Sequence, residues 1–335
     1  TKRMKTKMTK NNLTSNLTSN LTYKWKLWDG DPSSDRDKYI GGSDAGTILG
    51  LNPWKSPYTL WCEKTGLLTP EDISDKEAVW WGNYDEEGVA RRFTEKTNLE
   101  VQRSNKSYYL NEYPFLIGHI DRKLVGIKAG LECKTTSAFN KTDYENGDIP
   151  PTHYAQCQHY MLVTGWDKWY IATKRDNREF HWALVNRDDE YIQILLEKEL
   201  EFWDRVQNRV PPIIDGSEST SETVRALNGI TEDTEYDPPK TIDSNIEESI
   251  EIVNSIDEQI KVLEQSKKAY TNNIINWMGN STYASSTDWA IDYKPVKGRT
   301  TFNSAQFKKD HPDIYQNYMK QGLPTRRLSF KRIGE

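Results

Sequence analysis

Two acidic residues and a lysine stand close together near the middle of the sequence. Asp121 is followed, after ten intervening residues, by Glu132, Cys133 and Lys134. Side chains alternate between the two faces of a strand, so an extended segment over residues 130–135 puts Glu132 and Lys134 on one face and Cys133 on the other. The spacing therefore predicts a carboxylate and a cation that act side by side.

A hairpin would complete this centre. If residues 118–125 pair with residues 130–135, Asp121 comes close to Glu132, and two carboxylates in one site repel each other unless a cation lies between them. Mg²⁺ prefers oxygen ligands, keeps several waters and acidifies one of them for attack on a phosphodiester. Lys134 would orient that water or neutralise charge on the phosphate. We therefore expect a Mg²⁺ site, in which Mn²⁺ can substitute.

Three further polar side chains could join this centre. Glu86 lies in a helix predicted over residues 77–96 and could reach the same metal ion. Gln156 lies on another predicted helix, where its amide either holds a metal-bound water or is an ordinary surface group. His119 stands two residues before Asp121 and could contact a phosphate, although a packed or solvated histidine is the commoner case. The Asp…Glu-x-Lys pattern alone is a weak signal, because it also occurs by chance.

The elements that must position these groups alternate between helices and strands. A short helix through Leu51 is predicted to begin at a cap formed by Ser43 or Asp44. Strands flanked by helices predict a layered α/β or α+β domain. Apolar periodicity and turn signals predict its other elements, which are helices over 77–96, 154–163 and 188–208 and strands over 107–110, 116–125, 130–135, 168–173 and 179–185.

Composition divides the chain into four segments. Residues 1–27 are polar and repetitive, which is typical of a flexible tail, and residues 28–212 form the predicted core. Residues 213–243 are acidic and rich in Ser, Thr and Gly, as a linker would be. Residues 244–335 begin with apolar groups at three- and four-residue steps, which predict an amphipathic helix. They end in an apolar–basic alternation over 328–333 that predicts a strand in a small β unit.

The net charge of −5 is unevenly distributed. Residues 211–260 hold 13 acidic and 2 basic side chains, whereas residues 294–335 hold 10 basic and 3 acidic ones. Because phosphate contact depends on the local field, the overall acidity does not exclude a DNA partner. The basic carboxyl-terminal stretch could engage DNA, contact a protein partner or be an ordinary solvated surface.

Cysteine usage and hydropathy exclude several classes of protein. The three cysteines form no C-x-x-C pair, which argues against a disulfide framework and a structural zinc site. No apolar stretch approaches the roughly 20 residues that span a bilayer, and the amino end lacks the apolar core of a secretory signal, so we expect a cytosolic protein. Four tryptophans are expected mainly in the core, with stacking on unpaired bases as the alternative, and they are Trp54, Trp61, Trp80 and Trp81.

Five separated motifs, in the same order along the chain, resemble the YqaJ-type viral recombinase family. They are Ile40-Gly41-Gly42-Ser43-Asp44-Ala45, Leu49-Gly50-Leu51-Asn52-Pro53, Trp81-Gly82 with Glu86, Glu132-Cys133-Lys134-Thr135-Thr136, and Tyr154-Ala155-Gln156-Cys157-Gln158-His159-Tyr160-Met161. The resemblance covers roughly residues 28–213. This family is similar to phage lambda exonuclease, within the PD-(D/E)-x-K nuclease group.

The resemblance implies a central mixed sheet flanked by helices, one or two Mg²⁺ ions, and digestion of one strand of duplex DNA from its 5′ end in phage-type recombination. It also implies a single-strand annealing protein as partner and a ring-shaped trimer. Asp121, Glu132 and Lys134 match the catalytic signature, while Glu86 matches the helix glutamate and Gln156 the first Gln of a Gln-x-Gln motif. Two residues fall where the terminal 5′-phosphate is held, and they are Arg36 and Ser43.

The sequence departs from the family pattern on both sides of Asp121. Ile120 replaces the usual Pro and Arg122 replaces the usual Gly, and neither is expected to damage metal binding. His153 stands where the helix often has Tyr, and it is expected to be structural. Two other functions stay open: an endonuclease or single-strand nuclease of the same fold, and a DNA-binding accessory protein without catalysis. The presence of every expected acidic group and of the lysine favours an enzyme.

Overall fold

The computed structural model describes residues 21–27, 36–137, 144, 148–229, 238–320, 322 and 326–332. The chain divides into two compact units, Thr1–Asn228 and Gly229–Glu335. The predicted flexible tail lies outside the described residues up to residue 20. No helix in the described part of the chain is long and apolar enough to cross a membrane.

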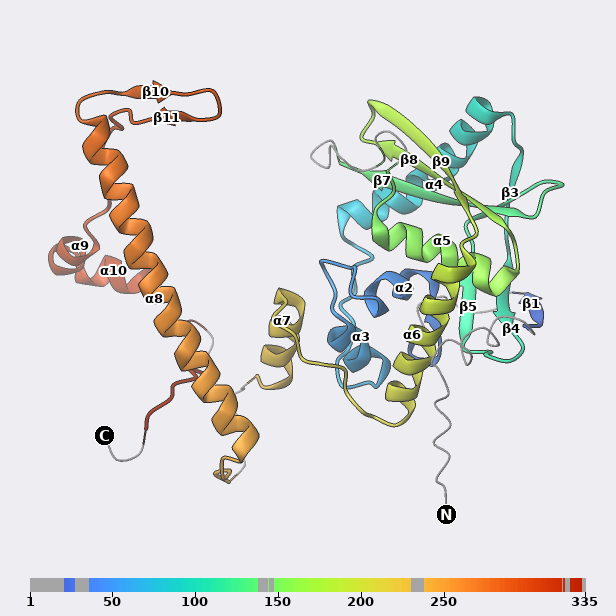
Figure 1. Ribbon diagram of the computed structural model, residues 1–335, viewed down its shortest axis with the longest axis horizontal. Helices are drawn as coiled ribbons and strands as arrows, with labels where there is room; N and C mark the ends of the chain where they lie inside the picture. Colours follow the sequence, from blue (N-terminus) through green and yellow to red (C-terminus); the bar gives the residue numbers. More distant parts are fainter. Residues whose placement is uncertain are drawn as a thin grey trace, which may run out of the picture. The chain divides into compact units, whose positions relative to one another are not determined.

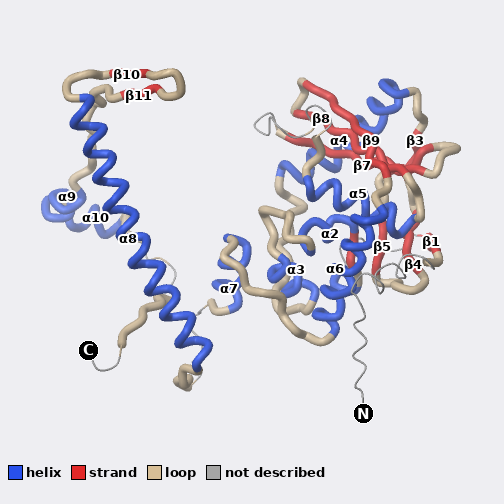
Figure 2. Tube along the Cα trace, in the orientation of Figure 1, coloured by secondary structure: helices blue, strands red, loops and turns tan. Residues whose placement is uncertain are grey.

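Two sheets form the framework of the first unit, and Figure 2 shows their strands as separate groups. The larger sheet is mixed, because β7 and β8 are parallel while its other pairs are antiparallel. Its order is β3 (Val101–Arg103), β6 (Arg122–Leu124), β7 (Ala129–Thr136), β8 (Lys168–Arg175) and β9 (Glu179–Asn186). The smaller sheet has the order β1 (Tyr23–Leu27), β4 (Lys106–Leu110), β5 (Leu116–His119) and β2 (Ile40–Gly41).

Helices cover both faces of the larger sheet (Figure 1). On one face, α4 (Glu77–Thr97) buries Val89 and Phe93 against Leu131 of β7. On the other face, α5 (Pro151–Thr164) stacks Tyr160 on Trp169 of β8, with ring centroids 4.9 Å apart. The remaining helical elements of this unit are η1 (Arg36–Lys38), α2 (Gly42–Ile48), α3 (Pro57–Lys64), α6 (Asp189–Gln207) and α7 (Glu218–Leu227). The mixed α/β fold predicted from the sequence is confirmed.

The strand predicted over 116–125 is interrupted at Ile120 and at Asp121, a candidate metal ligand. β5 ends at His119 in the smaller sheet, and β6 begins at Arg122 in the larger one, so the chain crosses between sheets at Ile120 and Asp121. The prediction of one continuous strand is therefore wrong. The predicted hairpin is confirmed in its distal part, where Arg122 pairs with Leu131. Extended by one residue, this register places Asp121 opposite Glu132.

Several predicted boundaries are also wrong. Tyr23–Leu27 pairs with β4 as strand β1, so the fold begins before Trp28. The segment predicted as a linker contains α7, which packs on α3 through hydroxyl contacts such as Thr59 Oγ1 to Thr223 Oγ1 at 2.8 Å. Helix α2 begins after Gly41, and Asp44 accepts a hydrogen bond from Gly41 N at 3.1 Å from within the first turn, so neither Ser43 nor Asp44 is the cap residue.

The second unit contains one long helix and several short elements. Helix α8 (Ser244–Met278) is capped by the Asp243 side chain and extends the predicted amphipathic helix to 35 residues. A small antiparallel hairpin follows, formed by β10 (Tyr283–Ser285) and β11 (Ala290–Asp292). Helices α9 (Ser304–Asp310) and α10 (Pro312–Asn317) come next. Residues 326–332 are not in a strand, so the strand predicted over 328–333 is not found in the described residues.

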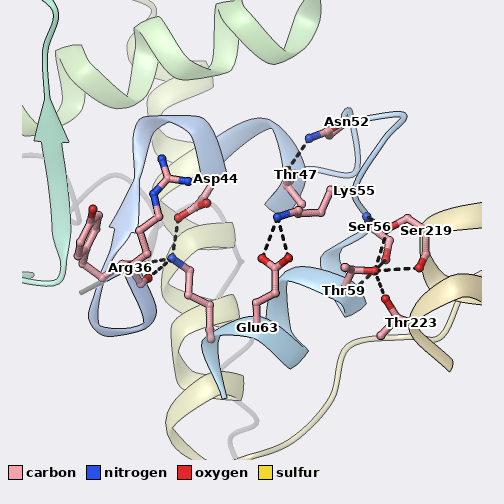
Figure 3. A network of polar contacts seen from close by, with 12 residues as sticks. Arg36, Asp44, Thr47, Asn52, Lys55, Ser56, Thr59, Glu63, Ser219 and Thr223 are labelled. Atoms are coloured by element: carbon pink, nitrogen blue, oxygen red, sulfur yellow. Dashed lines mark hydrogen bonds and ion pairs between the residues drawn. The ribbon is translucent and has the colours of Figure 1, made fainter. Parts of the chain in front are cut away.

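A buried lysine fastens the segment that carries Arg36 and Ser43. Lys64 Nζ donates hydrogen bonds to the carbonyl oxygens of Arg36 at 2.5 Å and Tyr39 at 2.6 Å, and to Asp44 Oδ2 at 2.8 Å. Only 3% of its side chain is exposed. Figure 3 shows this network together with the partly buried pair Lys55–Glu63 and the hydroxyl contacts between α3 and α7. A charge buried this deeply stabilises the fold only while all its acceptors stay paired.

Replacing this lysine should destabilise the first unit. Lys64→Met removes the ammonium donor of two backbone carbonyls and of Asp44, which then keeps only the Gly41 N–H, and this should cost roughly 2–4 kcal/mol of unfolding free energy. Lys55→Met is the matched control, because Lys55 also pairs with a carboxylate at 2.8 Å but its side chain is 38% exposed. The control should cost under about 1 kcal/mol. Urea denaturation of both variants measures the difference, and equal losses would contradict the role given to Lys64.

A second buried pair ties β5 to the helices. His159 Nδ1 of α5 lies 2.7 Å from Glu199 Oε1 of α6, and His159 Nε2 lies 3.1 Å from the carbonyl oxygen of Ile117. Burial by itself lowers the pKa of His159, but Glu199 and the Ile117 carbonyl favour the charged ring and raise its pKa above the ordinary value. Its complete burial and its two partners indicate a structural role for this histidine.

This pair should make stability depend on pH. A raised pKa in the folded state means that the stabilisation is fully present below about pH 6.5 and is lost as the pH rises through the folded pKa. Glu199→Gln should therefore flatten the decline in unfolding free energy above about pH 6.5, besides lowering stability by roughly 3 kcal/mol at the acidic end. Glu179→Gln, which removes the exposed partner of His181, should leave the decline unchanged. An unaltered slope in Glu199→Gln would contradict this assignment.

Candidate active site

One cavity of about 430 Å³ collects all the candidate site residues predicted from the sequence. β7 and the β5–β6 crossing form one side, while α4, α5 and the segment from η1 to α2 form the others. The eight predicted site residues that line it are Arg36, Ser43, Glu86, His119, Asp121, Glu132, Lys134 and Gln156. Residues from six elements spread over 121 positions of sequence thus meet in one place, although their individual roles stay predictions.

The centre of the cavity is a hydrogen-bonded group on β7 and α5. Lys134 Nζ lies 2.7 Å from Glu132 Oε1 and donates to Gln156 Oε1 at 3.1 Å. Gln156 Nε2 donates to the same Glu132 oxygen at 2.8 Å and to Tyr160 Oη at 2.9 Å. Leu131 and Cys133 pack toward α4 instead, which confirms the predicted alternation of faces along β7. Gln156 is therefore a buried member of the site and not a surface amide.

Asp121 reaches β7 through its side chain. Its Oδ2 accepts a hydrogen bond from the backbone N–H of Cys133 at 2.9 Å. Burial, with the neighbouring charge of Glu132 as the next cause, raises the pKa of Asp121 to about 8. Burial lowers the pKa of Lys134, but the contact with Glu132 outweighs it, so that the pKa of Lys134 is raised and the amine stays charged. When both carboxyl groups are ionised they face one ammonium group, and the site then carries an excess of negative charge.

This excess suits a divalent cation. Glu132 Oε1 receives both donors, whereas Glu132 Oε2 is buried and has no hydrogen-bond partner among the described residues. An unpaired buried carboxylate oxygen beside a carboxyl group of raised pKa is costly, and a hard cation with oxygen ligands relieves both costs. Asp121 and Glu132 therefore fit the predicted Mg²⁺ site.

Glu86 is placed differently from the other carboxylates. Arg122 Nη1 donates to Glu86 Oε1, and Arg122 Nη2 donates to Glu87 Oε2 at 3.0 Å. Arg103 Nη2 lies 3.8 Å from the same Glu86 oxygen. Within the described residues, no three His, Cys, Asp or Glu side chains converge in a group that could hold a metal ion. Glu86 lines the same cavity as Asp121 and Glu132, with one of its oxygens paired with arginine, and its role as a metal ligand stays a prediction.

Close packing of α2 on α5 forms the part of the cavity around Arg36 and Ser43. A Cβ atom on Gly42 would lie 2.6 Å from Tyr160 Cε1 and 3.2 Å from Gln156 Cγ. Such contacts are too short, so a larger residue would push α2 away from the centre. The glycine therefore keeps Ser43 within the same cavity as Gln156.

His119 lies at the end of β5, where its ring faces the cavity. Its Nδ1 lies 3.2 Å from Ser107 Oγ, and its ring packs edge-on against Tyr39 with centroids 5.6 Å apart. Burial, followed by the positive charge of Arg36, lowers the pKa of His119 to about 4. A neutral ring at pH 7 offers a hydrogen bond to a phosphate but no charge. His153, by contrast, contacts Tyr144 Oη, in agreement with the structural role predicted for it.

Sequence reasoning missed one residue of the site and one partner of Glu86, and it misplaced three tryptophans. Tyr160 follows Gln156 by one helical turn, a spacing that could have indicated its contact. Arg122 was expected to be harmless to metal binding, and nothing local signals its pairing with a glutamate 36 positions earlier. Trp61 is buried as predicted, whereas the other three are exposed and not in the core, and these are Trp54, Trp80 and Trp81.

Comparisons with known proteins show the family of this chain. Residues 33–167 match the model of the YqaJ-like viral recombinase domain. The uncharacterized protein YqaJ of Bacillus subtilis (strain 168) is 36% identical over 304 residues, which cover 89% of this chain and 93% of that protein.

Solved structures overlap with this chain over part of its length. The crystal structure of LHK-Exo in complex with dAMP is similar over 58% of this chain and 94% of the LHK-Exo chain. The two are 15% identical in sequence, and the TM-score is 0.45. A phage related exonuclease from Haemophilus somnus 129PT is similar over 51% of this chain and 96% of the exonuclease chain, with 14% sequence identity and a TM-score of 0.38. With a curated relative at 36% identity along nearly its whole length, the chain belongs to the YqaJ-like viral recombinase family.

Proposed function

We propose that this chain is a Mg²⁺-dependent nuclease that digests one strand of duplex DNA from its 5′ end during phage-type recombination. One observation carries the proposal: Asp121, Glu132, Lys134 and Gln156 meet in one cavity, with an unpaired buried carboxylate oxygen at its centre. The carboxylates provide oxygen ligands for a hard metal cation, and the ammonium group of Lys134 lies beside them. Membership in a viral recombinase family supports recombination as the setting.

Each residue of the centre has a chemical task in this proposal. Asp121 and Glu132 would hold Mg²⁺, which supplies an acidified water for attack on the phosphodiester. Lys134 is kept charged by Glu132 and would neutralise charge that develops on the phosphate. Gln156, whose Nε2 is fixed by Glu132 and Tyr160, keeps the Lys134 amine in place through its Oε1.

The other end of the cavity would set the polarity of digestion. Arg36 carries a permanent charge and Ser43 a hydroxyl group, which are groups that recognise a terminal phosphate. Lys64 fastens the backbone on which both stand. In this proposal a 5′-phosphate bound there places the first phosphodiester at the Asp121–Glu132 centre. A single-strand annealing protein as partner and a ring-shaped trimer also belong to the proposal.

Substitutions at the centre should abolish digestion. The assay is a linear duplex labelled at either the 5′ or the 3′ end, with Mg²⁺ or with EDTA. Lys134→Ala and Asp121→Asn should each lower the rate by about 10²-fold or more, because the first removes positive charge beside the reacting phosphate and the second weakens a ligand of the metal ion. Lys198→Ala, which alters an exposed pair on α6, should digest like the parent. Label should leave from the 5′ end, and only with Mg²⁺.

Two controls separate the proposal from its alternatives. A closed circular duplex should stay intact, since it has no end, and its cleavage would indicate an endonuclease. Circular dichroism confirms that each inactive variant is folded. If the folded parent leaves linear, circular and single-stranded DNA intact with Mg²⁺ and with Mn²⁺, the chain is an accessory DNA-binding protein and not a nuclease.

Substitutions near α2 should act on end recognition. Arg36→Ala and Ser43→Ala should each reduce the preference for 5′-phosphorylated over 5′-hydroxyl ends by roughly tenfold, the value of one hydrogen bond to a charged group. Arg92→Ala, which removes an exposed arginine paired with Glu95 on α4, should keep the full preference. Competition between the two kinds of duplex in one reaction measures the ratio. A preference unchanged in both variants would mean that the phosphate binds elsewhere.

A further inference from the structure

Helix α8 of the second unit exposes a continuous apolar face. Steps of three and four residues alternate along this helix and mark ten positions on one face, which we call the seam. They are Ile246, Ser249, Val253, Ile256, Ile260, Leu263, Lys267, Tyr270, Ile274 and Trp277. The eight apolar or aromatic residues among them are between 42% and 72% exposed. An apolar face that is open over such a length marks an interaction site.

The spacing of the seam is that of a coiled coil. Alternating steps of three and four average 3.5 residues, and this repeat keeps one stripe of a helix facing a partner helix. Seams sustained over about three to four repeats of seven residues are typical of coiled coils, and this one extends from Ile246 to Trp277. The helix is unbroken over the same range (Figure 1). The seam therefore fits a second helix of similar length.

The charges of α8 are segregated along its length. Residues 244–260 hold five acidic and no basic side chains, whereas residues 261–278 hold three lysines and one glutamate. The helix dipole favours this order only in the first and last turns, and Asp257 and Glu258 lie well beyond the first turn. Two copies of α8 that run antiparallel bring the acidic half of each onto the basic half of the other, while a parallel pair brings like charges together. The charge pattern thus selects an antiparallel second copy.

The sizes of the seam residues favour the same direction. The bulky residues Tyr270 and Trp277 belong to the carboxyl-terminal half of α8. In an antiparallel pair with complete overlap, Trp277 lies level with Ile246 of the second copy, and Tyr270 lies level with Val253. Each large ring then meets a smaller branched side chain, as close packing of a core requires. A parallel pair would instead place each ring against its own copy and leave the amino-terminal half underfilled.

Lys267 also distinguishes the two directions. It is the one charged residue of the seam, and a parallel pair would bring two Lys267 ammonium groups together, where they repel each other. In the antiparallel pair, Lys267 lies level with Ile256 of the second copy and next to Asp257. The ammonium group then has a carboxylate of the other chain beside it.

The carboxyl-terminal segment of the same chain contacts a different face of α8. Arg332 Nη2 lies 3.7 Å from Glu251 Oε1. Glu251 stands two residues from both Ser249 and Val253, and residues two apart on a helix point to opposite sides. This contact therefore leaves the seam open.

We propose that α8 is a dimerisation helix, whose seam packs on the same seam of a second copy of this chain in an antiparallel coiled coil. The same surface serves on both copies, which is the arrangement of a twofold symmetric dimer. The assembly carries two candidate active sites, one from each chain. This association goes beyond the proposed function and does not depend on it.

The mass of the full chain in solution tests the proposal. Ile260→Asp puts a charge in the middle of the seam, so its mass by multi-angle light scattering should be half that of the parent. Val262→Asp is the matched control, because Val262 is 59% exposed on the same helix but lies two residues from Ile260, off the seam. This control should keep the parent mass. If other surfaces also form a trimer, the parent has six chains and Ile260→Asp three, and the ratio is still two.

Two outcomes of this comparison overturn the proposal. Equal masses of the parent and Ile260→Asp would mean that the seam faces another protein or another part of the chain. A mass halved in Val262→Asp as well would mean that the association does not depend on the seam.

Disulfide cross-linking tests the direction and stays decisive if Ile260→Asp fails to fold. Positions 249 and 274 lie level across the antiparallel pair, so the double variant Ser249→Cys, Ile274→Cys should form a covalent dimer in oxidised glutathione. Neither single variant should do so. The parent, which has the free cysteines Cys62, Cys133 and Cys157, gives the background. A covalent dimer of either single variant would indicate a parallel pair, and its absence in the double variant would exclude the antiparallel one.

Discussion

Two carboxyl groups within one cavity, the partly buried Asp121 and the buried Glu132, impose the constraint on which the rest of the structure depends. Neither burial nor the proximity of a like charge favours ionised carboxylates, and the raised pKa of Asp121 records that cost. The surroundings offset part of it: Lys134 and Gln156 donate to one oxygen of Glu132, and the Cys133 backbone donates to Asp121. The negative charge of the carboxyl groups that these donors do not offset makes the site suitable for a cation.

Holding these groups together depends on packing on both faces of one strand. β7 turns Leu131 toward the apolar face of α4 and, one residue later, Glu132 toward α5. A slip of one residue would exchange the two faces and bury the carboxylate in the apolar cluster. The parallel pairing with β8 along the whole of β7, together with Trp169 stacked on α5, fixes this register. The sheet that forms the core thereby also orients the side chains of the candidate site.

Three cationic side chains in and near the cavity contact different parts of the first unit. Lys134 contacts Glu132 directly, Arg122 neutralises Glu86 on α4, and Lys64 fastens the backbone of the segment that bears Arg36. Each cation has its own carboxylate partner or set of carbonyl acceptors, so that the charges are fixed in place. This pre-organisation matters for phosphate chemistry, because donors already in position need no reorganisation when charge develops.

The sequence alone determined most helices and strands of the first unit and the composition of its candidate site. Periodicity is a local property, so the alternation on β7 and the helix that carries Glu86 could be predicted from neighbouring residues. Tertiary structure decided the break at Asp121, the pairing of Tyr23–Leu27 with β4, the packing of α7 on α3 and the contact of Arg122 with Glu86. These features join segments from 36 to 164 positions apart or exchange one sheet for another. No local pattern encodes them, because their free energy comes from contacts that exist only once the chain has folded.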